Sequence, residues 1–247
     1  MRLRLLTWNI HKGIGMDRRF RPERIVEVIR HYQADVVLLQ EVDNGARRSR
    51  RLDLAAWISE RTGHEWHAWA GTHALKEGGY GNAILSRLPI RRRRNVDLTI
   101  GRCKQRAALY VRLDLPGHFK DLHVFNWHLG LSSAERALQV RRLLDSGTLH
   151  WLPASARVVV GGDTNDWRNL LFPTAGLQSE GFHAYSEHGR RGHWKTYPSP
   201  APVGALDKFF WRGAFADPQV HASRLKLARV ASDHLPLIGD FELVPRG

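Results

Sequence analysis

Hydrophobic runs of strand length recur along the whole chain, and many of them end in a polar residue. They predict β-strands at residues 3–9, 35–41, 65–70, 81–86, 106–115, 120–128, 157–163, 205–211 and 234–242. Pro116 and Gly117 separate two of these runs, so residues 106–128 are expected to form a hairpin. The three runs ending near Asn9, Asp163 and His234 indicate a polar site at one edge of a sheet.

Three segments carry the hydrophobic period of a helix. The first begins at Pro22 and continues to Tyr32, and the second covers residues 54–61 before Gly63, a favourable C-terminal cap. The third follows the capping box that Ser132 opens and runs towards residue 147. Residues 176–204 are rich in Gly, Pro, His and Ser and are expected to form a loop. This pattern predicts two packed mixed β-sheets with helices on the outside, in the α/β class.

The composition is that of a globular protein with a large core. Its 247 residues are 43% hydrophobic and 25% charged, which predicts a single domain over residues 1–247. No apolar run reaches the ~20 residues that span a bilayer, and the N-terminus does not read as a signal peptide. The single cysteine, Cys103, suits a reducing compartment. We therefore expect a soluble cytoplasmic protein, and a monomer.

The chain is strongly basic, which narrows its partners. Lys and Arg total 38 against 24 acids, a formal net charge of +14. Such a surface attracts polyanions, including nucleic acid, anionic lipid headgroups and phosphorylated small molecules. The run Arg91–Arg94 is either a charged edge strand or a contact for a DNA backbone, and the basic, aromatic segment 186–200 is a second candidate surface. A high arginine content also follows from the base composition of some genomes.

Polar residues at or near the predicted strand ends supply the chemistry. They are Asn9, Glu41, Asn82, His128, Asp163, Asn165, Asp207, Asp233 and His234. Oxygen ligands of this kind favour Mg²⁺ or Mn²⁺, as one ion or two. The chain has neither a P-loop nor a Gly-x-Ser-x-Gly elbow, so nucleotide-triphosphate binding and serine nucleophiles are unsupported. Metal-assisted attack of water on a phosphoester remains.

Six motifs in order resemble those of the endonuclease/exonuclease/phosphatase superfamily, whose members include DNase I-like nucleases. They lie at residues 7–10, 39–42, 80–86, 126–129, 161–165 and 232–236, and together they extend over nearly the whole chain. The resemblance implies a four-layer α/β/β/α sandwich. It also implies a metal-dependent phosphoester hydrolase.

The resemblance implies roles for individual residues. Asn9, Glu41 and Asp233 are similar to metal-binding positions of the family. Asp163 and Asn165 resemble the pair that activates water and orients the phosphate. The remaining catalytic positions are His128 and His234, which resemble phosphate-contacting histidines, and Asp207, which resembles the acid that orients His234. An ion pair between Asp207 and Lys208 is the alternative for that acid.

Two further positions resemble substrate-binding residues. Asn82 is similar to an amide near the substrate phosphate, with a turn-capping role as the alternative, and Arg106 is similar to a phosphate-binding arginine. The family acid that partners His128 has no good match, and Glu77 is a weak candidate for it. Three tryptophans, Trp8, Trp127 and Trp167, adjoin these motifs and are expected mainly in the core.

The substrate stays open between two classes. A phosphodiesterase or nuclease acting on nucleic acid comes first, and a phosphoesterase acting on a phospholipid headgroup or inositol phosphate comes second. A third possibility, an inactive fold that binds polyanions, is disfavoured because the acids and both histidines are present. Peripheral contact with an anionic membrane would fit the second class.

Overall fold

The first of two β-sheets holds the N-terminus of the chain. The computed structural model describes residues 1–185, 194–216 and 218–244. In spatial order the first sheet contains β11 (Gln219–Ala222), β12 (Leu237–Glu242), β1 (Arg2–Asn9), β2 (Val36–Asn44), β4 (Gly79–Ser86) and β3 (Trp66–Ala74). β1 and β2 are parallel, and the other neighbours are antiparallel, so the sheet is mixed.

The second sheet repeats this mixed arrangement. In spatial order it contains β5 (Ile90–Asp97), β6 (Ala107–Asp114), β7 (Asp121–His128), β8 (Val158–Asp163), β10 (Asp207–Arg212) and β9 (His183–Ala184). Its one parallel pair is β7 with β8, among the strands described. The expected hairpin is present as β6 and β7.

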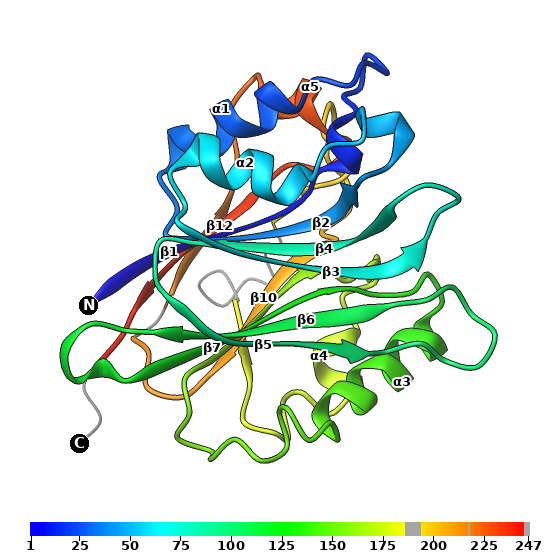
Figure 1. Ribbon diagram of the computed structural model, residues 1–247. Helices are drawn as coiled ribbons and strands as arrows, with labels where there is room; N and C mark the ends of the chain where they lie inside the picture. The colour runs from blue at the N-terminus through cyan, green and yellow to red at the C-terminus, as the bar shows by residue number, and fades with distance from the viewer. Residues whose placement is uncertain (186–193, 217, 245–247) are drawn as a thin grey trace.

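Helices cover the outer face of each sheet, which gives four layers (Figure 1). The first sheet is covered by α1 (Pro22–Tyr32), α2 (Leu54–Thr62) and α5 (Ala228–Ala231), and the second by α3 (Ser133–Leu144) and α4 (Leu171–Thr174). The local signals work as expected: Pro22 opens α1, Gly63 caps α2 with a φ of 71°, and the Ser132 hydroxyl accepts from the Glu135 amide at 3.1 Å. The predicted α/β sandwich is confirmed.

Alternation along the strands divides the hydrophobic residues among three cores. In β1, Leu3 and Leu5 pack between the sheets, whereas Leu6 and Trp8 pack under the helices. A strand buried on both faces reads as a continuous apolar run, which is why the sequence marks it so clearly. Because Asn9 has the same parity as Leu5, its side chain lies on the face towards the other sheet.

The two sheets are also joined by a buried polar bridge. The Gln40 Nε2 atom donates to the Asn126 Oδ1 atom at 2.7 Å. Asn126 Nδ2 donates in turn to the carbonyl oxygens of Leu39 and Ala83, both at 2.8 Å. These bonds tie β7 of the second sheet to β2 and β4 of the first.

Several boundaries differ from the expectation. β5 contains the arginine run and lies at the edge of the second sheet, where charged side chains face water. β11 was not anticipated, because four residues at a sheet edge give little periodic signal. β12 begins only at Leu237, so Asp233 and His234 precede a strand rather than end one.

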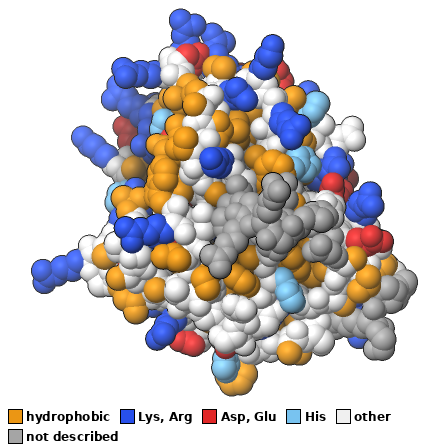
Figure 2. Space-filling view, turned by 180° about the vertical axis from the view of Figure 1, so that it is seen from behind, with side chains coloured by type: hydrophobic (Ala, Val, Ile, Leu, Met, Phe, Trp, Pro, Cys, Tyr) orange, Lys and Arg blue, Asp and Glu red, His pale blue; other side chains and the backbone are white. Residues whose placement is uncertain are grey.

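The surface reflects the basic composition. Figure 2 shows Lys and Arg side chains spread around the margin of one face, with Asp and Glu sparser among them. Among the residues described, no helix has the length and apolar character needed to cross a membrane.

Candidate functional site

The candidate site lies where the ends of both sheets meet. β1 and β2 run parallel in one sheet and β7 and β8 in the other, and their carboxyl ends reach the same edge. Register then aligns the side chains, because Asp163 lies opposite both His128 and Asp207. A cavity of about 590 Å³ opens here. Its lining includes eight of the ten predicted site residues, namely Asn9, Glu41, Arg106, His128, Asp163, Asn165, Asp233 and His234.

Asp163 is the centre of this arrangement. Its Oδ2 atom accepts from Asn9 Nδ2 at 3.1 Å and lies 3.5 Å from His128 Nε2 and 3.7 Å from His234 Nε2. Its Oδ1 atom accepts from the Asn165 amide at 2.9 Å. One buried carboxylate therefore orders a residue of the first sheet, both histidines and the loop that follows β8.

His234 is held by the carboxylate expected from the sequence. Its Nδ1 atom lies 2.8 Å from Asp207 Oδ2, so Asp207 is paired with the histidine and not with Lys208. Burial opposes a charge on His234, but Asp207 and Asp163 outweigh it and raise its pKa to about 10. The backbone is fixed as well, since Trp8 Nε1 donates to the His234 carbonyl at 2.8 Å. The imidazole is thus oriented with Nε2 towards Asp163.

His128 has the opposite electrostatic character. Burial lowers its pKa to about 4, although Asp163 acts against that shift, and Arg106 adds to the lowering. Two histidines beside one carboxylate therefore differ in charge at neutral pH. Glu77 is not the partner of His128, because it forms an exposed ion pair with Arg51 at 2.9 Å.

Glu41 is directed into the cavity by an irregularity in β2. The register of β2 against β4 shifts between Leu39 and Val42, and Glu41 has a φ of 59°, unusual for a residue with a side chain. Burial disfavours its charge, but His128 and Lys12 outweigh that effect and lower its pKa to about 2. Since His128 is neutral above about pH 4, Lys12 is the partner that keeps Glu41 ionised at neutral pH.

Asn165 and Asp233 complete the polar lining. Asn165 Nδ2 donates to the Leu129 carbonyl at 2.9 Å, which fixes the side-chain amide in the loop directly after β8. Asp233 Oδ1 accepts from the Ser232 hydroxyl at 3.2 Å, and that hydroxyl also donates to the Asn9 carbonyl at 2.7 Å. Asp233 is thereby placed on the same side of the cavity as Asn9.

The two predicted substrate-binding residues have different positions. Arg106 lines the cavity, and its Nε atom is buried without a hydrogen-bond partner in the described structure. Asn82 lies outside the lining, where its Nδ2 atom donates to the carbonyls of Ala107 and Asn126 at 3.1 and 3.3 Å. Its placement favours a link between sheets over the substrate contact that the resemblance implied.

Three residues of the site were not anticipated as such. Lys12 pairs with Glu41, and the Tyr197 ring lies 4.8 Å from the His234 ring, centroid to centroid. Trp167 is 53% exposed at the cavity, unlike Trp8 and Trp127, which are buried in the core. A lysine three residues after Asn9, or a tyrosine in a loop, carries no local signal. Of the basic segment 186–200, residues 186–193 lie outside the described part.

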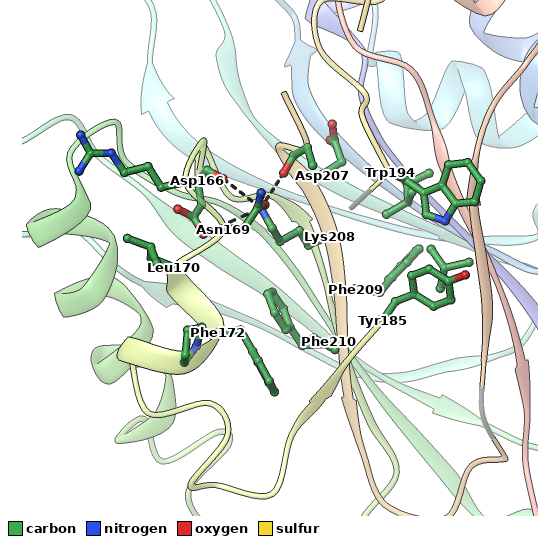
Figure 3. A pocket seen from close by; sticks show the side chains of 16 residues that line it. Asp166, Asn169, Leu170, Phe172, Tyr185, Trp194, Asp207, Lys208, Phe209 and Phe210 are labelled. Carbon is green, nitrogen blue, oxygen red and sulfur yellow. Dashed lines mark hydrogen bonds and ion pairs between the residues drawn. The ribbon is translucent and has the colours of Figure 1, made fainter. Parts of the chain in front are cut away.

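A second cavity, of about 610 Å³, adjoins the site along β10 (Figure 3). Its walls include the aromatic rings of Tyr185, Trp194, Phe209 and Phe210, and Lys208 lies among the polar residues at one side. Lys208 Nζ donates to Thr164 Oγ1 at 3.1 Å and to the carbonyls of Asp166 and Ala205 at 3.2 and 2.6 Å.

Comparisons with known proteins agree with the fold. The family model described as "Endonuclease/Exonuclease/phosphatase family" matches residues 6–234. The uncharacterized protein YbhP of Escherichia coli is 35% identical over 254 residues, covering 97% of this chain and 96% of that protein. An endonuclease/exonuclease/phosphatase structure from Bacteroides vulgatus superposes with a TM-score of 0.79 at 17% identity, covering 99% of this chain and 100% of that one.

A second structure of that family, from Beutenbergia cavernae, has a TM-score of 0.75 at 24% identity and covers 98% of this chain and 72% of its own. At these identities the two structures bear on the fold alone. The family model covers most of the chain, and the site residues fall within or at the end of the matched range. The chain belongs to the endonuclease/exonuclease/phosphatase family.

Proposed function

We propose that this protein is a divalent-metal-dependent phosphodiesterase in which water attacks the phosphorus in line. Family membership makes it a phosphoesterase- or nuclease-type hydrolase. The observation that carries the finer proposal is the position of Asp163 Oδ2, which lies within 3.7 Å of nitrogens from Asn9, His128 and His234. A phosphate bound beside this carboxylate would contact both histidines, and Asp163 would be close enough to accept a proton from the attacking water.

Each side chain then has a role that follows from its contacts. Asp163 Oδ2 is the acceptor placed to take a proton from the attacking water. His234 presents Nε2 to the phosphoryl group, because Asp207 occupies its Nδ1 atom. Arg106 brings a cation whose Nε hydrogen has no partner in the described structure, and a phosphate oxygen would supply one. Charge that develops on the phosphoryl oxygens is thereby met by groups already in place.

The chain's residues fit a bound Mg²⁺ or Mn²⁺. Glu41, Asp233 and Asn9 present oxygen ligands around one side of the cavity. The ion pair between the Lys12 ammonium and Glu41 supports an ionised carboxylate at this position. No group of three His, Cys, Asp or Glu converges as a ready metal cage within the described residues. Mg²⁺ is commonly held by one or two carboxylates, with water and substrate phosphate as the other ligands.

When bound there, the ion would neutralise charge on the phosphoryl oxygens and lower the pKa of nearby water. Asn9 is ordered for this by the His11 amide, which donates to its Oδ1 atom at 3.1 Å. Ser232 holds Asp233 on the same side.

Two substrate classes fit different parts of the molecule. The net charge of +14 favours a polyanion such as nucleic acid. The rim of the cavity favours an amphiphilic phosphodiester, since Leu131 and Trp167 are exposed there beside the polar lining. A phospholipid headgroup has this combination of phosphate and apolar surface.

Hydrolysis assays with supercoiled plasmid, structured RNA, phospholipid vesicles and a soluble bis-phosphodiester dye test the proposal. We expect turnover of at least one substrate with Mg²⁺ and none with EDTA. Asp163→Ala should lower kcat by roughly 10³-fold, because it removes the water acceptor and the partner of both histidines. Asp114→Ala, an exposed acid paired with Arg91, is the matched control and should retain activity. Full activity of Asp163→Ala would sink the assignment.

A further inference from the structure

The solvent face of α3 carries apolar residues where an ordinary surface helix is polar. Leu131, just before the helix, is 77% exposed, and Leu138 is 49% exposed. Ala134 is exposed between them, and Arg141 and Arg142 follow one turn later. Residues three and four apart share a helix face, so Ala134, Leu138 and the two arginines form one stripe of α3, with Leu131 at its N-terminal end. The opposite face, with Val140 and Leu143, packs on the second sheet (Figure 1).

This apolar stripe is continuous with the mouth of the catalytic cavity. Leu131 and Trp167 both line that cavity and are both exposed. Arg136 of α3 lies 3.6 Å from Asp166, the residue before Trp167. Because this ion pair is buried, it holds α3 and the loop of Trp167 in a fixed position relative to each other.

Trp167 is fixed at the rim rather than free to turn. Its ring meets the Tyr197 ring edge-on, with centroids 5.7 Å apart at 89°. It also packs so closely on Gly204 that a Cβ at that position would lie 2.8 Å from the indole. The exposed part of the indole is therefore a preformed apolar surface beside Leu131.

Exposed arginines lie on and beside the apolar surface, at the end of α3 and next to Trp167. Arg102, Arg141, Arg142 and Arg168 are all exposed. Arg142 donates to the Thr99 carbonyl, which ties the end of α3 to the loop that leads to Arg102. Glu135 is the one acid of α3, and its carboxylate accepts from Gln139 Nε2 at 3.0 Å.

We propose that the stripe of α3, together with Leu131 and Trp167, docks on an anionic lipid surface and brings the cavity to a membrane-borne phosphodiester. Leu and Trp side chains enter the boundary between headgroups and acyl chains, and arginines contact lipid phosphates. A nucleic-acid backbone is contacted chiefly by cations and hydrogen-bonding groups, and it gains nothing from exposed leucine. The choice of substrate rests on the proposed function, whereas the docking surface is tested without it.

Vesicle co-sedimentation tests the surface, with phosphatidylcholine alone or mixed with phosphatidylglycerol. We expect binding to the anionic mixture. Leu138→Ser should weaken it roughly tenfold through lost apolar burial, and Arg141→Ser about fivefold through lost attraction to the anionic surface. The matched controls are exposed strand residues outside this face: Trp66→Ser, at the start of β3, for the apolar change, and Arg93→Ser, in the middle of the edge strand β5, for the charge. Both should bind as the wild type does.

Hydrolysis of the soluble dye separates the two proposals. Leu138 does not line the cavity, so Leu138→Ser should turn over the dye at the wild-type rate. Wild-type vesicle binding with no turnover of the dye, plasmid, RNA or phospholipid would reject the proposed hydrolysis and keep the surface. The surface is rejected if the wild type ignores anionic vesicles or if Leu138→Ser binds them as well as the Trp66 control. Duplex DNA binding weakened by Arg141→Ser but not by Leu138→Ser would assign the face to nucleic acid instead.

Discussion

Lys208 joins two of the segments that carry the candidate catalytic residues. Its three donated hydrogen bonds reach Thr164 and Asp166 after β8, and Ala205 before β10. Asp163 and Asp207 lie on those same two segments. Burial lowers the pKa of Lys208 to about 8, with Asp166 as the largest opposing influence. The ammonium therefore holds together the two segments that carry these acids, and Figure 3 shows Lys208 between Asp166 and Asp207.

Lys208→Met should reduce both stability and turnover. Removing the ammonium leaves three buried acceptors and part of the Asp166 charge uncompensated, which costs about 3 kcal/mol of unfolding free energy. Misplacement of Asp163 and Asp207 should lower kcat by roughly 10²-fold and leave KM little changed. Urea unfolding and steady-state kinetics measure the two effects. A wild-type kcat would show that Lys208 does not position the acids.

At the scale of elements, a buried histidine just after α2 links that helix to the segment between α1 and β2. His64 Nδ1 lies 2.7 Å from Thr62 Oγ1, and His64 Nε2 lies 3.1 Å from the Ala34 carbonyl. Burial lowers the pKa of His64 to about 4; the Ala34 carbonyl and Asp35 act against the shift, and Arg87 adds to it. The neutral imidazole is thus the form that the folded protein favours.

Because the pKa of His64 is low in the folded protein, the free energy of unfolding decreases as the pH is lowered. Above the ordinary pKa of 6.5, His64 is neutral in both the folded and the unfolded protein, and its contribution to stability is fully present. Below that pH the unfolded chain binds a proton, whereas the folded protein binds it only near pH 4. We expect a loss of ~2 kcal/mol between pH 7.5 and pH 5 from this residue. Urea unfolding at both pH values, for wild type and His64→Gln, isolates the term. Equal losses in the two proteins would contradict it.

At the scale of the whole molecule, the inter-sheet polar bridge is the feature that aligns the two halves of the site. Asn126 is fully buried and lies two residues before His128, while Gln40 lies directly before Glu41. The bond between these amides therefore sets how the end of β7 faces the end of β2. Hydrophobic packing alone permits small sliding of one sheet on the other, whereas directional hydrogen bonds oppose it.

Asn126→Leu should loosen this alignment. The change keeps a side chain of similar volume but leaves the carbonyls of Leu39 and Ala83 without the hydrogen bonds that Asn126 Nδ2 donates. We expect a loss of about 3 kcal/mol in unfolding free energy. Asn95→Leu, at an exposed amide, is the control and should change stability by less than ~0.5 kcal/mol. Chemical denaturation of both variants provides the comparison, and similar midpoints would deny the bridge its role.

The sequence predicted most of the strands and the principal helices because burial on both faces leaves long apolar runs. It was weaker at the sheet edges. The arginines of β5 hide its strand character, and β11 is too short to show a period. Of the site, the polar residues at the ends of β1, β7 and β8 could be named from their motifs. The bonds that Asn82 makes between the sheets could not be foreseen, because nothing local tells a side chain that links sheets from one that meets substrate.

By itself, the sequence determined the layered α/β class, the family and the residue types available at the site, since these depend on local periodicity and ordered motifs. Only the tertiary structure decided which of them meet. Asp207 and His234 are 27 residues apart, and Trp8 and His234 are 226 apart, so their contacts arise from sheet register and not from spacing. The left-handed turn at Glu41 and the apolar solvent face of α3 likewise become meaningful only beside the cavity they border.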